Sequence, residues 1–350
     1  MSKTIVVTST RTSAGKTTVG LGCALASKGT KIGYFKPFGD RLVYKKKHLL
    51  DADAVLFRSV LGAPGAPEGH CLGFDYELLW KQSKTTDMAK ELKLHLKAVS
   101  PGRDLVIVES GFNFSYGRWP KLDALSIART LDAEILLVAD GDPGIVYDKC
   151  SVFNDCAHDA GLKLNGIVIN QIAASWKDKM GWAADALKDE FSMDVLGMIP
   201  ELPEIGRLTM ETVAEKLSAK VLAGSNGLCK TVTKVRVGAM SAESAIAVRA
   251  FHEPGKLIIT SGDRVDFILL ALESNTSGII LTNGVIPHSN ILAKAEEVGV
   301  PILSVQTDTY STAKLVERIV PEVRPTDDTK IAEIEKGIKK NVDVAKALGV

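Results

Sequence analysis

Cysteine is scarce in this chain, and its pattern excludes two classes of protein. The five cysteines are an odd count, with no Cys-x-x-Cys pair and no cluster with histidine at zinc-ligand spacing. A disulfide framework and a structural zinc site are therefore both excluded. We expect free thiols in a reducing cytosol, most of them small core residues.

An excess of charge and long apolar runs are lacking too. Lys and Arg number 43 against 42 for Asp and Glu, a net charge of +1, which argues against binding to nucleic acid or to an anionic membrane. The longest apolar runs break at Asp or Gly within about ten residues, too few to span a membrane. The first ten residues do not read as a signal peptide. We expect a cytoplasmic protein with no membrane partner and no nucleic-acid partner.

The length of 350 residues predicts two domains. In the N-terminal part, short apolar runs alternate with amphipathic stretches such as Thr18–Ser27 and Lys177–Phe191, the pattern of an α/β fold with a parallel sheet. The predicted strands are Thr4–Thr8, Lys31–Phe35, Asp104–Glu109, Glu134–Ala139 and Gly166–Asn170.

A cluster of proline and glycine at Gly197–Gly206 predicts the end of a first domain covering residues 1–205. A smaller α/β domain is expected over residues 206–330, beginning with a linker helix, and a charged C-terminal helix over residues 331–350. Predicted helices here are Leu208–Ala223, Val265–Leu272 and Ser289–Val298, and predicted strands are Lys256–Thr260, Gly278–Thr282 and Pro301–Val305.

The segment after the first strand carries the strongest functional signal. Gly15-Lys16-Thr17 ends a Walker A phosphate loop, although Thr10 stands where the first glycine is usual. Backbone N–H groups and the helix start make an anion cradle, Lys16 reaches the β- and γ-phosphates, and the Thr17 hydroxyl can ligate Mg²⁺. The plain alternative is a helix cap without a ligand. The residues expected to bind a nucleotide here are Thr12, Ser13, Ala14, Gly15, Lys16, Thr17 and Thr18.

Charged residues follow two more of the predicted strands, at Lys36 and Glu109. Ligands of parallel α/β folds bind at the carboxyl ends of strands, so both side chains are expected beside the phosphate loop. Mg²⁺ favours one or two carboxylates together with phosphate oxygens. Glu109 and Asp53 are the candidates, with Asp51 as the less favoured choice because one of the two aspartates can serve as a helix N-cap. The expected metal ligands are Thr17, Asp53 and Glu109.

These motifs together resemble the dethiobiotin synthetase family and its cobyrinic-acid-amidating relatives. The resemblance rests on six segments over residues 1–205: Thr10–Thr17, Tyr34–Pro37, Asp53-Ala54, Val108–Gly111, Gly166–Asn170 and Gly197–Pro200. It implies a P-loop NTPase-type sheet, a metal-ligand role for Glu109, an adenine-reading role for Asn170, and closure over the adenosine by Pro200 and its neighbours.

The chain departs from that family at two points. Arg11 stands where the synthetases have an aspartate; related dimeric ATPases place a lysine there that reaches the partner's nucleotide, so Arg11 either acts across a subunit interface or neutralises phosphate. Phe112–Arg118 replaces the Gly-rich substrate loop, which makes dethiobiotin synthesis itself doubtful. No cysteine has a glutaminase-like setting, which argues against an amidotransferase.

The second half resembles a DRTGG domain, through Val237–Ser241, Thr260–Asp266, Ile280–Gly284 and Gln306–Thr312. A dethiobiotin-synthetase-like domain followed by a DRTGG domain is the N-terminal half of long phosphotransacetylases, here without their catalytic domain. The resemblance implies a homodimer. The turn at Gly262-Asp263-Arg264 suits an anion or a nucleotide phosphate, and a small-molecule ligand of this domain is expected. Alternatively Asp263 caps the helix, Arg264 pairs with it or with Asp266, and Thr309 and Ser311 cap the next helix.

Three functions follow. The favoured one is a Mg·ATP-binding sensor or regulator with at most slow ATPase activity, linked to acyl-phosphate or acetyl-CoA metabolism. A protein partner in acetate or acyl-CoA metabolism is expected with it. The alternative is an ATP-dependent ligase that activates a small carboxylate or carbamate as a mixed phosphoric anhydride, with Lys16 and Lys36 as its catalytic residues. The third is a structural protein with a vestigial site, which the intact charged residues argue against.

Overall fold

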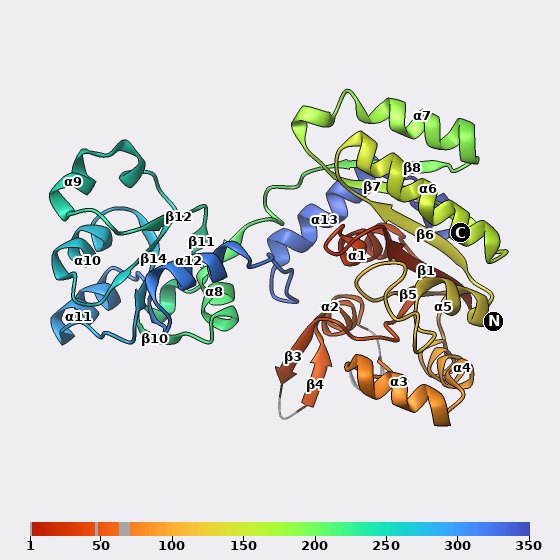
Figure 1. Ribbon diagram of the computed structural model, residues 1–350, viewed down its shortest axis with the longest axis horizontal. Coiled ribbons are helices and arrows are strands. Elements are labelled where there is room, and N and C mark those ends of the chain that lie inside the picture. The colour runs from red at the N-terminus through yellow and green to blue at the C-terminus, as the bar shows by residue number, and fades with distance from the viewer. Residues whose placement is uncertain (1, 46–47, 63–70) are drawn as a thin grey trace. The chain divides into compact units, whose positions relative to one another are not determined.

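The computed structural model describes residues 2–45, 48–62 and 71–350, and the chain forms two compact units (Figure 1). The first unit comprises residues 1–202 together with 323–350, and the second comprises residues 203–322. The chain thus leaves the first unit once and returns to it.

A six-stranded parallel sheet forms the centre of the first unit, in the order β2-β5-β1-β6-β7-β8. Its strands are β1 (Lys3–Ser9), β2 (Ile32–Phe35), β5 (Leu105–Glu109), β6 (Glu134–Ala139), β7 (Leu164–Ile172) and β8 (Val195–Pro200). The predicted α/β fold with a P-loop NTPase-type parallel sheet is confirmed. Because every strand runs the same way, their carboxyl ends share one edge, where α/β proteins bind ligands.

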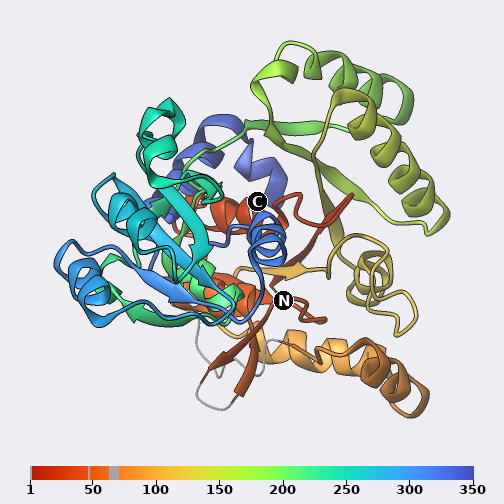
Figure 2. The ribbon, with the colours of Figure 1, turned by 60° about the vertical axis from the view of Figure 1, so that its left-hand side comes forward.

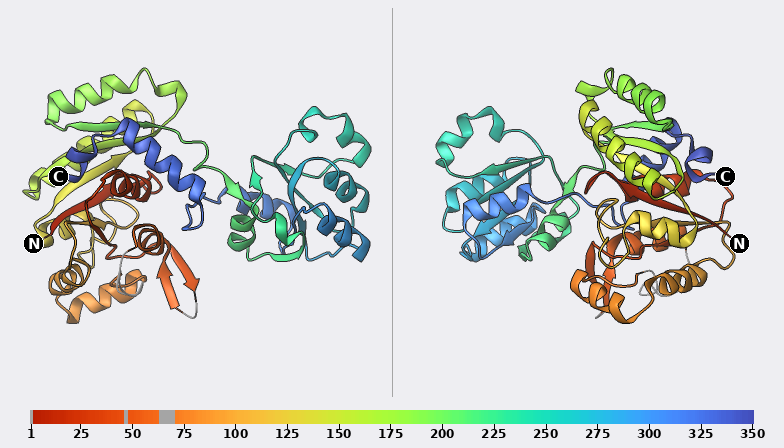
Figure 3. Two further views of the ribbon diagram at one scale, coloured as in Figure 1. Left: turned by 180° about the vertical axis from the view of Figure 1, so that it is seen from behind. Right: turned by 45° about the vertical axis from the view of Figure 1, so that its right-hand side comes forward.

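Helices pack against this sheet, as Figures 1 and 3 show. They are α1 (Lys16–Ala26), α2 (Ala52–Leu61), α4 (Met88–Val99), α5 (Ala124–Leu131), α6 (Pro143–Asp159) and α7 (Met180–Phe191), and α3 (Tyr76–Thr85) precedes α4 in the chain. Apart from the terminal residues Glu109 and Glu134, the strands β5 and β6 are apolar and buried, as strands covered on both faces must be. The sequence did not predict the antiparallel hairpin of β3 (Leu42–Lys45) and β4 (His48–Asp51), which leads into α2.

The C-terminal segment belongs to the first unit, which differs from the expected division at residues 206–330 and 331–350. It forms two helices, α13 (Asp328–Asn341) and α14 (Val344–Leu348). The buried Ile338 of α13 packs so close to Gly22 of α1 that a Cβ there would collide with it. Val342 bridges to Gly197 of β8. The apolar face of a tail helix is visible in a sequence, but the surface that it covers is not.

The second unit is built on a five-stranded sheet in the order β10-β15-β14-β13-β12 (Figure 2). Its strands are β10 (Lys220–Ala223), β12 (Lys234–Val237), β13 (Lys256–Ser261), β14 (Thr276–Thr282) and β15 (Ile302–Ser304); β9 (Leu208–Thr209) and β11 (Thr231–Val232) form a separate ladder. Its helices are α8 (Met210–Lys216), α9 (Ala242–Ala247), α10 (Val265–Leu272), α11 (Ser289–Glu297) and α12 (Thr309–Glu317). The smaller α/β domain is therefore present.

The predicted helix over Leu208–Ala223 is wrong in its second half. α8 ends at Lys216, Ser218 takes a left-handed conformation with φ 49°, and Lys220–Ala223 is the antiparallel edge strand β10. A left-handed residue ends a helix because the next residues leave its axis. Residues 220–223 have only a weak helical pattern, so their pairing with β15 determines that they form a strand.

Among the described residues, none of the helices combines the length and the apolar character needed to cross a membrane.

Candidate functional site

The predicted phosphate loop lies between the end of β1 and the start of α1. Thr10 N–H donates to Val138 O of the neighbouring strand at 3.0 Å, which fixes the entry of the loop. Gly15 has φ 91°, and a Cβ there would collide with the Asn170 side chain, so only glycine fits. α1 begins at Lys16. The strand–loop–helix setting that a Walker A loop requires is therefore present.

Lys16 and Thr17 turn from the first helical turn toward β5. The buried Lys16 Nζ donates to the main-chain oxygen of Phe112 at 3.0 Å. Burial lowers its pKa, and the nearby Glu109 carboxylate opposes that effect. Thr17 Oγ1 donates to Glu109 Oε1 at 2.9 Å. The two side chains that the motif assigns to phosphate and metal thus lie beside the predicted metal ligand.

Glu109 ends β5 and is almost fully buried. Its second oxygen, Oε2, accepts a hydrogen bond from the Tyr34 hydroxyl at 3.0 Å. Burial and the neighbouring Asp53 raise the pKa of Glu109 to about 7, although the ammonium groups of Lys36 and Lys16 act in the opposite direction. A cation bound beside Glu109 would stabilise its ionised form.

Lys36, directly after β2, is surrounded by carboxylates. Its Nζ lies 2.5 Å from Asp40 Oδ1 and 2.6 Å from Asp53 Oδ2. It also lies 3.2 Å from Asp51 Oδ2 and 4.0 Å from Glu109 Oε1. Burial alone would lower the pKa of Lys36, but Asp53, Glu109 and the other carboxylates raise it well above its usual value. Lys36 is therefore charged and at the centre of the acidic residues.

The two candidate aspartates of the 51–54 segment have different roles. Asp51 is the N-cap of α2, because its Oδ1 accepts from the N–H groups of Asp53 and Ala54 at 2.9 and 3.1 Å. Asp53 carries Lys36 on one oxygen and Arg41 on the other, at 2.9 Å. Burial opposes ionisation of Asp53, but Lys36 and Arg41 outweigh it and lower its pKa to about 2. Asp53 is thus an ionised side chain in the site, whereas Asp51 has a capping role.

Asp40, Asp51 and Asp53 each place an oxygen within 4.8 Å of the others. Carboxylate and hydroxyl oxygens are the donors that Mg²⁺ prefers, so the side chains of Thr17, Asp53 and Glu109 suit that ion.

Arg11 is paired within its own chain. Its Nε donates to Asp140 Oδ1 at 2.7 Å, and a second guanidinium nitrogen lies 2.5 Å from Oδ2. Asp140 follows β6 and is buried, while the Arg11 side chain is 56% exposed. The pair lies next to the loop, because β6 is a neighbour of β1.

Two residues at the end of β7 contact the phosphate loop. The buried Asn170 Nδ2 donates to Ala14 O at 2.9 Å, and Gln171 Nε2 donates to Ser13 O at 3.0 Å. Pro200, at the end of β8, pairs in register with Ile172 and is exposed. Asn170 therefore supports the loop. The reading of adenine by Asn170 and the closure of Pro200 over the adenosine stay predictions.

The segment after Glu109 packs through aromatic rings. The Tyr116 ring lies 4.7 Å from Phe112, 4.8 Å from Phe38 and 5.4 Å from Tyr76, between centroids. A Cβ on Gly111 would collide with the Tyr116 ring. The Phe112 oxygen that accepts from Lys16 is therefore held by a packed aromatic cluster, unlike a Gly-rich substrate loop.

Sequence reasoning missed four side chains of this site: Tyr34, Asp40, Arg41 and Asp140. Asp140 carried a usable signal, because it directly follows an apolar strand predicted to lie in the sheet. Asp40 and Arg41 carried none, since only the folded turn brings them to Lys36 and Asp53.

In the second unit, we predicted either an anion-binding turn at residues 262–264 or a set of helix caps with an ion pair of Arg264. The contacts at the carboxyl ends of its strands differ in detail from the predicted caps and ion pair. Arg264 occupies the N-cap position of α10, and its guanidinium donates to the main-chain oxygens of Gly238 and Met240. The expected pairing of Arg264 with Asp263 or Asp266 is therefore wrong. Asp308, rather than Thr309 or Ser311, caps α12. These contacts connect neighbouring loops, and a ligand role for this edge stays a prediction.

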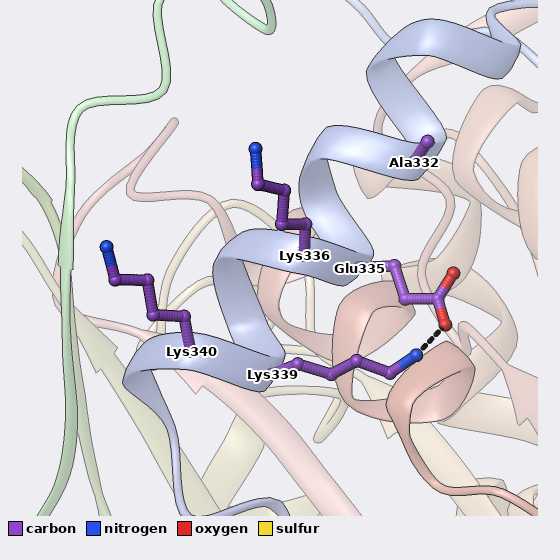
Figure 4. A pocket seen from close by; sticks show the side chains of 5 residues that line it. All are labelled: Ala332, Glu335, Lys336, Lys339 and Lys340. Carbon is purple, nitrogen blue, oxygen red and sulfur yellow. Dashed lines mark hydrogen bonds and ion pairs between the residues drawn. The ribbon is translucent and has the colours of Figure 1, made fainter.

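A shallow hollow of about 390 Å³ lies on α13 and is drawn in Figure 4. It is lined by Ala332, Glu335, Lys336, Lys339 and Lys340. Its side chains come from one helix, and Lys339 pairs with Glu335. It shares no residue with the site at the carboxyl ends of β1, β2 and β5.

Comparison with known proteins gives two family matches. Residues 3–209 match the family described as an AAA domain, and residues 212–319 match the DRTGG domain. Among curated proteins, the phosphate acetyltransferase of Nitrosomonas europaea is 25% identical over 356 residues, covering 94% of this chain and 49% of that protein. The chain spans about half the length of the curated relatives it matches. The resemblance to the N-terminal part of long phosphotransacetylases is confirmed.

Solved structures show weaker likeness. Cobyrinic acid a,c-diamide synthase from Mycobacterium smegmatis, with bound ADP and magnesium, has a TM-score of 0.40 at 15% identity, covering 58% of this chain and 88% of that one. A second solved structure contains the CBS and DRTGG domains of the regulatory region of Clostridium perfringens pyrophosphatase, complexed with the activator diadenosine tetraphosphate. It has a TM-score of 0.29 at 17% identity, covering 46% of this chain and 84% of that one.

Proposed function

Because the chain belongs to the AAA domain family over residues 3–209, with a DRTGG domain following it, we propose that it is a Mg·ATP-binding regulator. In this proposal the first unit binds the nucleotide, and the second unit conveys the nucleotide state to a ligand or a protein partner in acetate or acyl-CoA metabolism. Any ATPase activity is slow.

One observation carries the proposal. Thr17 Oγ1 donates to Glu109 Oε1 at 2.9 Å, directly beside Lys16 at the start of α1. A hydroxyl, a carboxylate and a buried ammonium at the end of a phosphate loop are the groups that a metal–nucleotide complex needs. A helix cap without a ligand would not require a buried lysine and a buried glutamate beside it, since burying charge is costly.

Each residue then has a role in binding. The backbone N–H groups of Thr12–Thr18 cradle the phosphates, and Lys16 contacts the β- and γ-phosphates. Thr17, Asp53 and Glu109 would hold Mg²⁺, which neutralises phosphate charge when bound. Asn170 and Pro200 would face the adenosine.

The alternative is a ligase that activates a small carboxylate or carbamate through a mixed anhydride. That reaction would use Lys36 to steady the acceptor or the transferred phosphoryl group. The short contacts of Lys36 Nζ with Asp40 and Asp53 support the regulator instead, because a lysine engaged by carboxylates is less available to an anionic acceptor.

The proposal includes a homodimer in the cytoplasm, with the subunit contacts bordering the nucleotide site. Sedimentation velocity of the purified chain with and without Mg·ATP tests this part, and a monomer under both conditions contradicts it.

The deciding experiment is a thermal-shift panel of the purified chain with ATP, GTP, ADP and acetyl-CoA, each with and without Mg²⁺. Ligand at a hundred times its Kd stabilises the folded state by about 2.7 kcal/mol. A Mg²⁺-dependent shift with ATP, followed by only slow ADP formation in ³¹P NMR, supports the regulator. Rapid turnover that appears only after addition of a small carboxylate or amine would establish the ligase, and no shift with any nucleotide would overturn both.

A further inference from the structure

The buried Lys36 is surrounded by more carboxylate than the proposed magnesium site uses. Asp40 makes the shortest of its ion pairs, at 2.5 Å from Nζ, and the Asp40 side chain is only 4% exposed. Asp53, at 2.6 Å, is the one proposed metal ligand among the three aspartates around Lys36. Asp40 holds the same ammonium group as Asp53 but is not one of the proposed metal ligands, so it needs another role.

Asp51 is committed to the backbone around it. Its Oδ1 accepts from the first turn of α2, and its Oδ2 accepts from the N–H groups of Asp40 and Arg41 at 3.0 and 3.1 Å. Its distance to Lys36 Nζ, 3.2 Å, is the longest of the three aspartates. Asp51 therefore orders the turn and the helix and contributes less to holding Lys36.

Asp53 already carries a cationic side chain on each oxygen, so a metal ion at either oxygen would repel at least one of them. Lys36 occupies Oδ2 and Arg41 occupies Oδ1. A Mg²⁺ ion that takes an oxygen of Asp53 must weaken at least one of these contacts. If Lys36 lost Asp53 without compensation, a buried ammonium would lose one of its two closest counter-ions, which is unfavourable.

Asp40 is fixed where it can supply that compensation. The main chain just before it is anchored on a neighbouring segment, because Gly39 N–H donates to Gly73 O at 3.0 Å and Leu72 N–H donates to Pro37 O at 2.9 Å. The Asp40 N–H is held by Asp51. The Asp40 carboxylate is therefore pinned beside Lys36 independently of Asp53.

We propose that Asp40 is a positioning residue for Lys36. It retains the ammonium when Asp53 turns to the metal, so that Mg²⁺ does not compete with Lys36 for the same carboxylate. This inference rests on the proposed Mg·ATP function, and it concerns a residue that the phosphate-loop motif and the resemblance leave without a role.

Calorimetry of ATP binding to the full chain, in Mg²⁺ and in EDTA, tests the proposal. The measured quantity is the Kd in EDTA divided by the Kd in Mg²⁺. This ratio is the factor by which the metal strengthens ATP binding. In Asp40→Asn, Lys36 depends on Asp53 and competes with Mg²⁺, so we expect the ratio to fall about tenfold. The Kd in EDTA should be unchanged or smaller, because a negative charge near the phosphates is gone.

A double-mutant cycle separates positioning from metal ligation. In a Lys36→Gln background there is no ammonium to hold, so adding Asp40→Asn should leave the ratio unchanged. If Asp40 were itself a metal ligand, the added substitution would lower the ratio again. The double variant removes one buried charge of each sign, which keeps the comparison available if Asp40→Asn alone folds poorly. The exposed Asp155→Asn, on α6, is the control for an equal change in net charge.

The outcomes are distinct. A ratio in Asp40→Asn equal to that of wild type overturns the inference while the Mg·ATP function stands, even if the variant is less stable. A further drop in the Lys36→Gln background overturns it in favour of metal ligation. Absence of any Mg²⁺ effect in the wild-type chain overturns the proposed function and this inference together.

Discussion

Arg11 of the phosphate loop and Asp140 at the end of β6 form a two-pronged ion pair within one chain, with nitrogen–oxygen distances of 2.7 and 2.5 Å. Paired contacts of this kind are more directional than single ones. They connect the second residue of the loop to the strand next to β1. The pair favours a role for Arg11 within its own subunit over the alternative of reaching a partner's nucleotide.

Disrupting this pair should therefore lower the stability of the isolated chain. We expect Asp140→Asn to reduce the free energy of unfolding by about 1 kcal/mol, a modest effect because Arg11 is more than half exposed. Urea unfolding of wild type, Asp140→Asn, Arg11→Ala and the double variant measures the coupling between the two side chains. If Arg11 mainly serves a partner subunit, the coupling energy will be zero.

Lys16 is the residue on which the nucleotide proposal depends most. Lys16→Ala should remove ATP binding while leaving the fold intact, because Lys16 contributes one hydrogen bond to Phe112 O in the structure. We expect a loss of affinity of about a hundredfold or more, the removal of a charged contact to phosphate. Calorimetry with Mg²⁺, beside a circular dichroism spectrum, checks both parts, and an unchanged ATP affinity would defeat the site assignment.

The sequence predicted those parts of the site that follow directly from strands. Lys16, Lys36 and Glu109 lie at the carboxyl ends of parallel strands or start the helix after one, so an apolar run followed by a charged residue was enough to bring them together. Asp40 and Arg41 come from the segment just before β3, whose conformation depends on Asp51 accepting their N–H groups. Such contacts arise only after the turn has folded, and no spacing in the sequence indicates them.

The same limit applies at the C-terminus. The sequence predicted a charged helix at the C-terminus, but the missing side chain at Gly22, which opens room for Ile338 on α1, lies more than three hundred residues earlier in the chain. Long-range complementarity of this kind is decided by packing.

Asn170 offers a test that separates support of the loop from recognition of the base. Because Asn170 donates a hydrogen bond to Ala14 O, we expect Asn170→Ala to loosen the loop and so to weaken the binding of inorganic triphosphate to some extent. If Asn170 also faces adenine, ATP should lose about tenfold more affinity than triphosphate does. Gln171→Ala is the matched control, because it removes a similar bond to Ser13 O from an exposed side chain. Equal losses for both ligands would show that Asn170 only supports the loop.

The raised pKa of Glu109, about 7, makes stability depend on pH in a defined direction. Between the ordinary glutamate pKa of about 4.5 and 7, the folded state binds more protons at this group than the unfolded state does, so stability falls as pH rises through that range. The effect has an upper size of about 3 kcal/mol at pH 8. Asp53 acts in the opposite sense, because its pKa of about 2 adds stability that is lost only as pH falls from about 4 toward 2.

Glu109→Gln isolates the first effect, since a neutral amide keeps the shape of the side chain without its ionisation. The melting temperature of the variant should exceed that of wild type by an amount that grows from pH 5 to pH 8. Addition of Mg·ATP at pH 8 should narrow this difference, because a metal ion stabilises the ionised Glu109 and finds a weaker ligand in glutamine. Thermal melts of both proteins at four pH values, with and without Mg·ATP, measure this directly. If the difference in melting temperature between the two proteins is the same at every pH, Glu109 is not the titrating group.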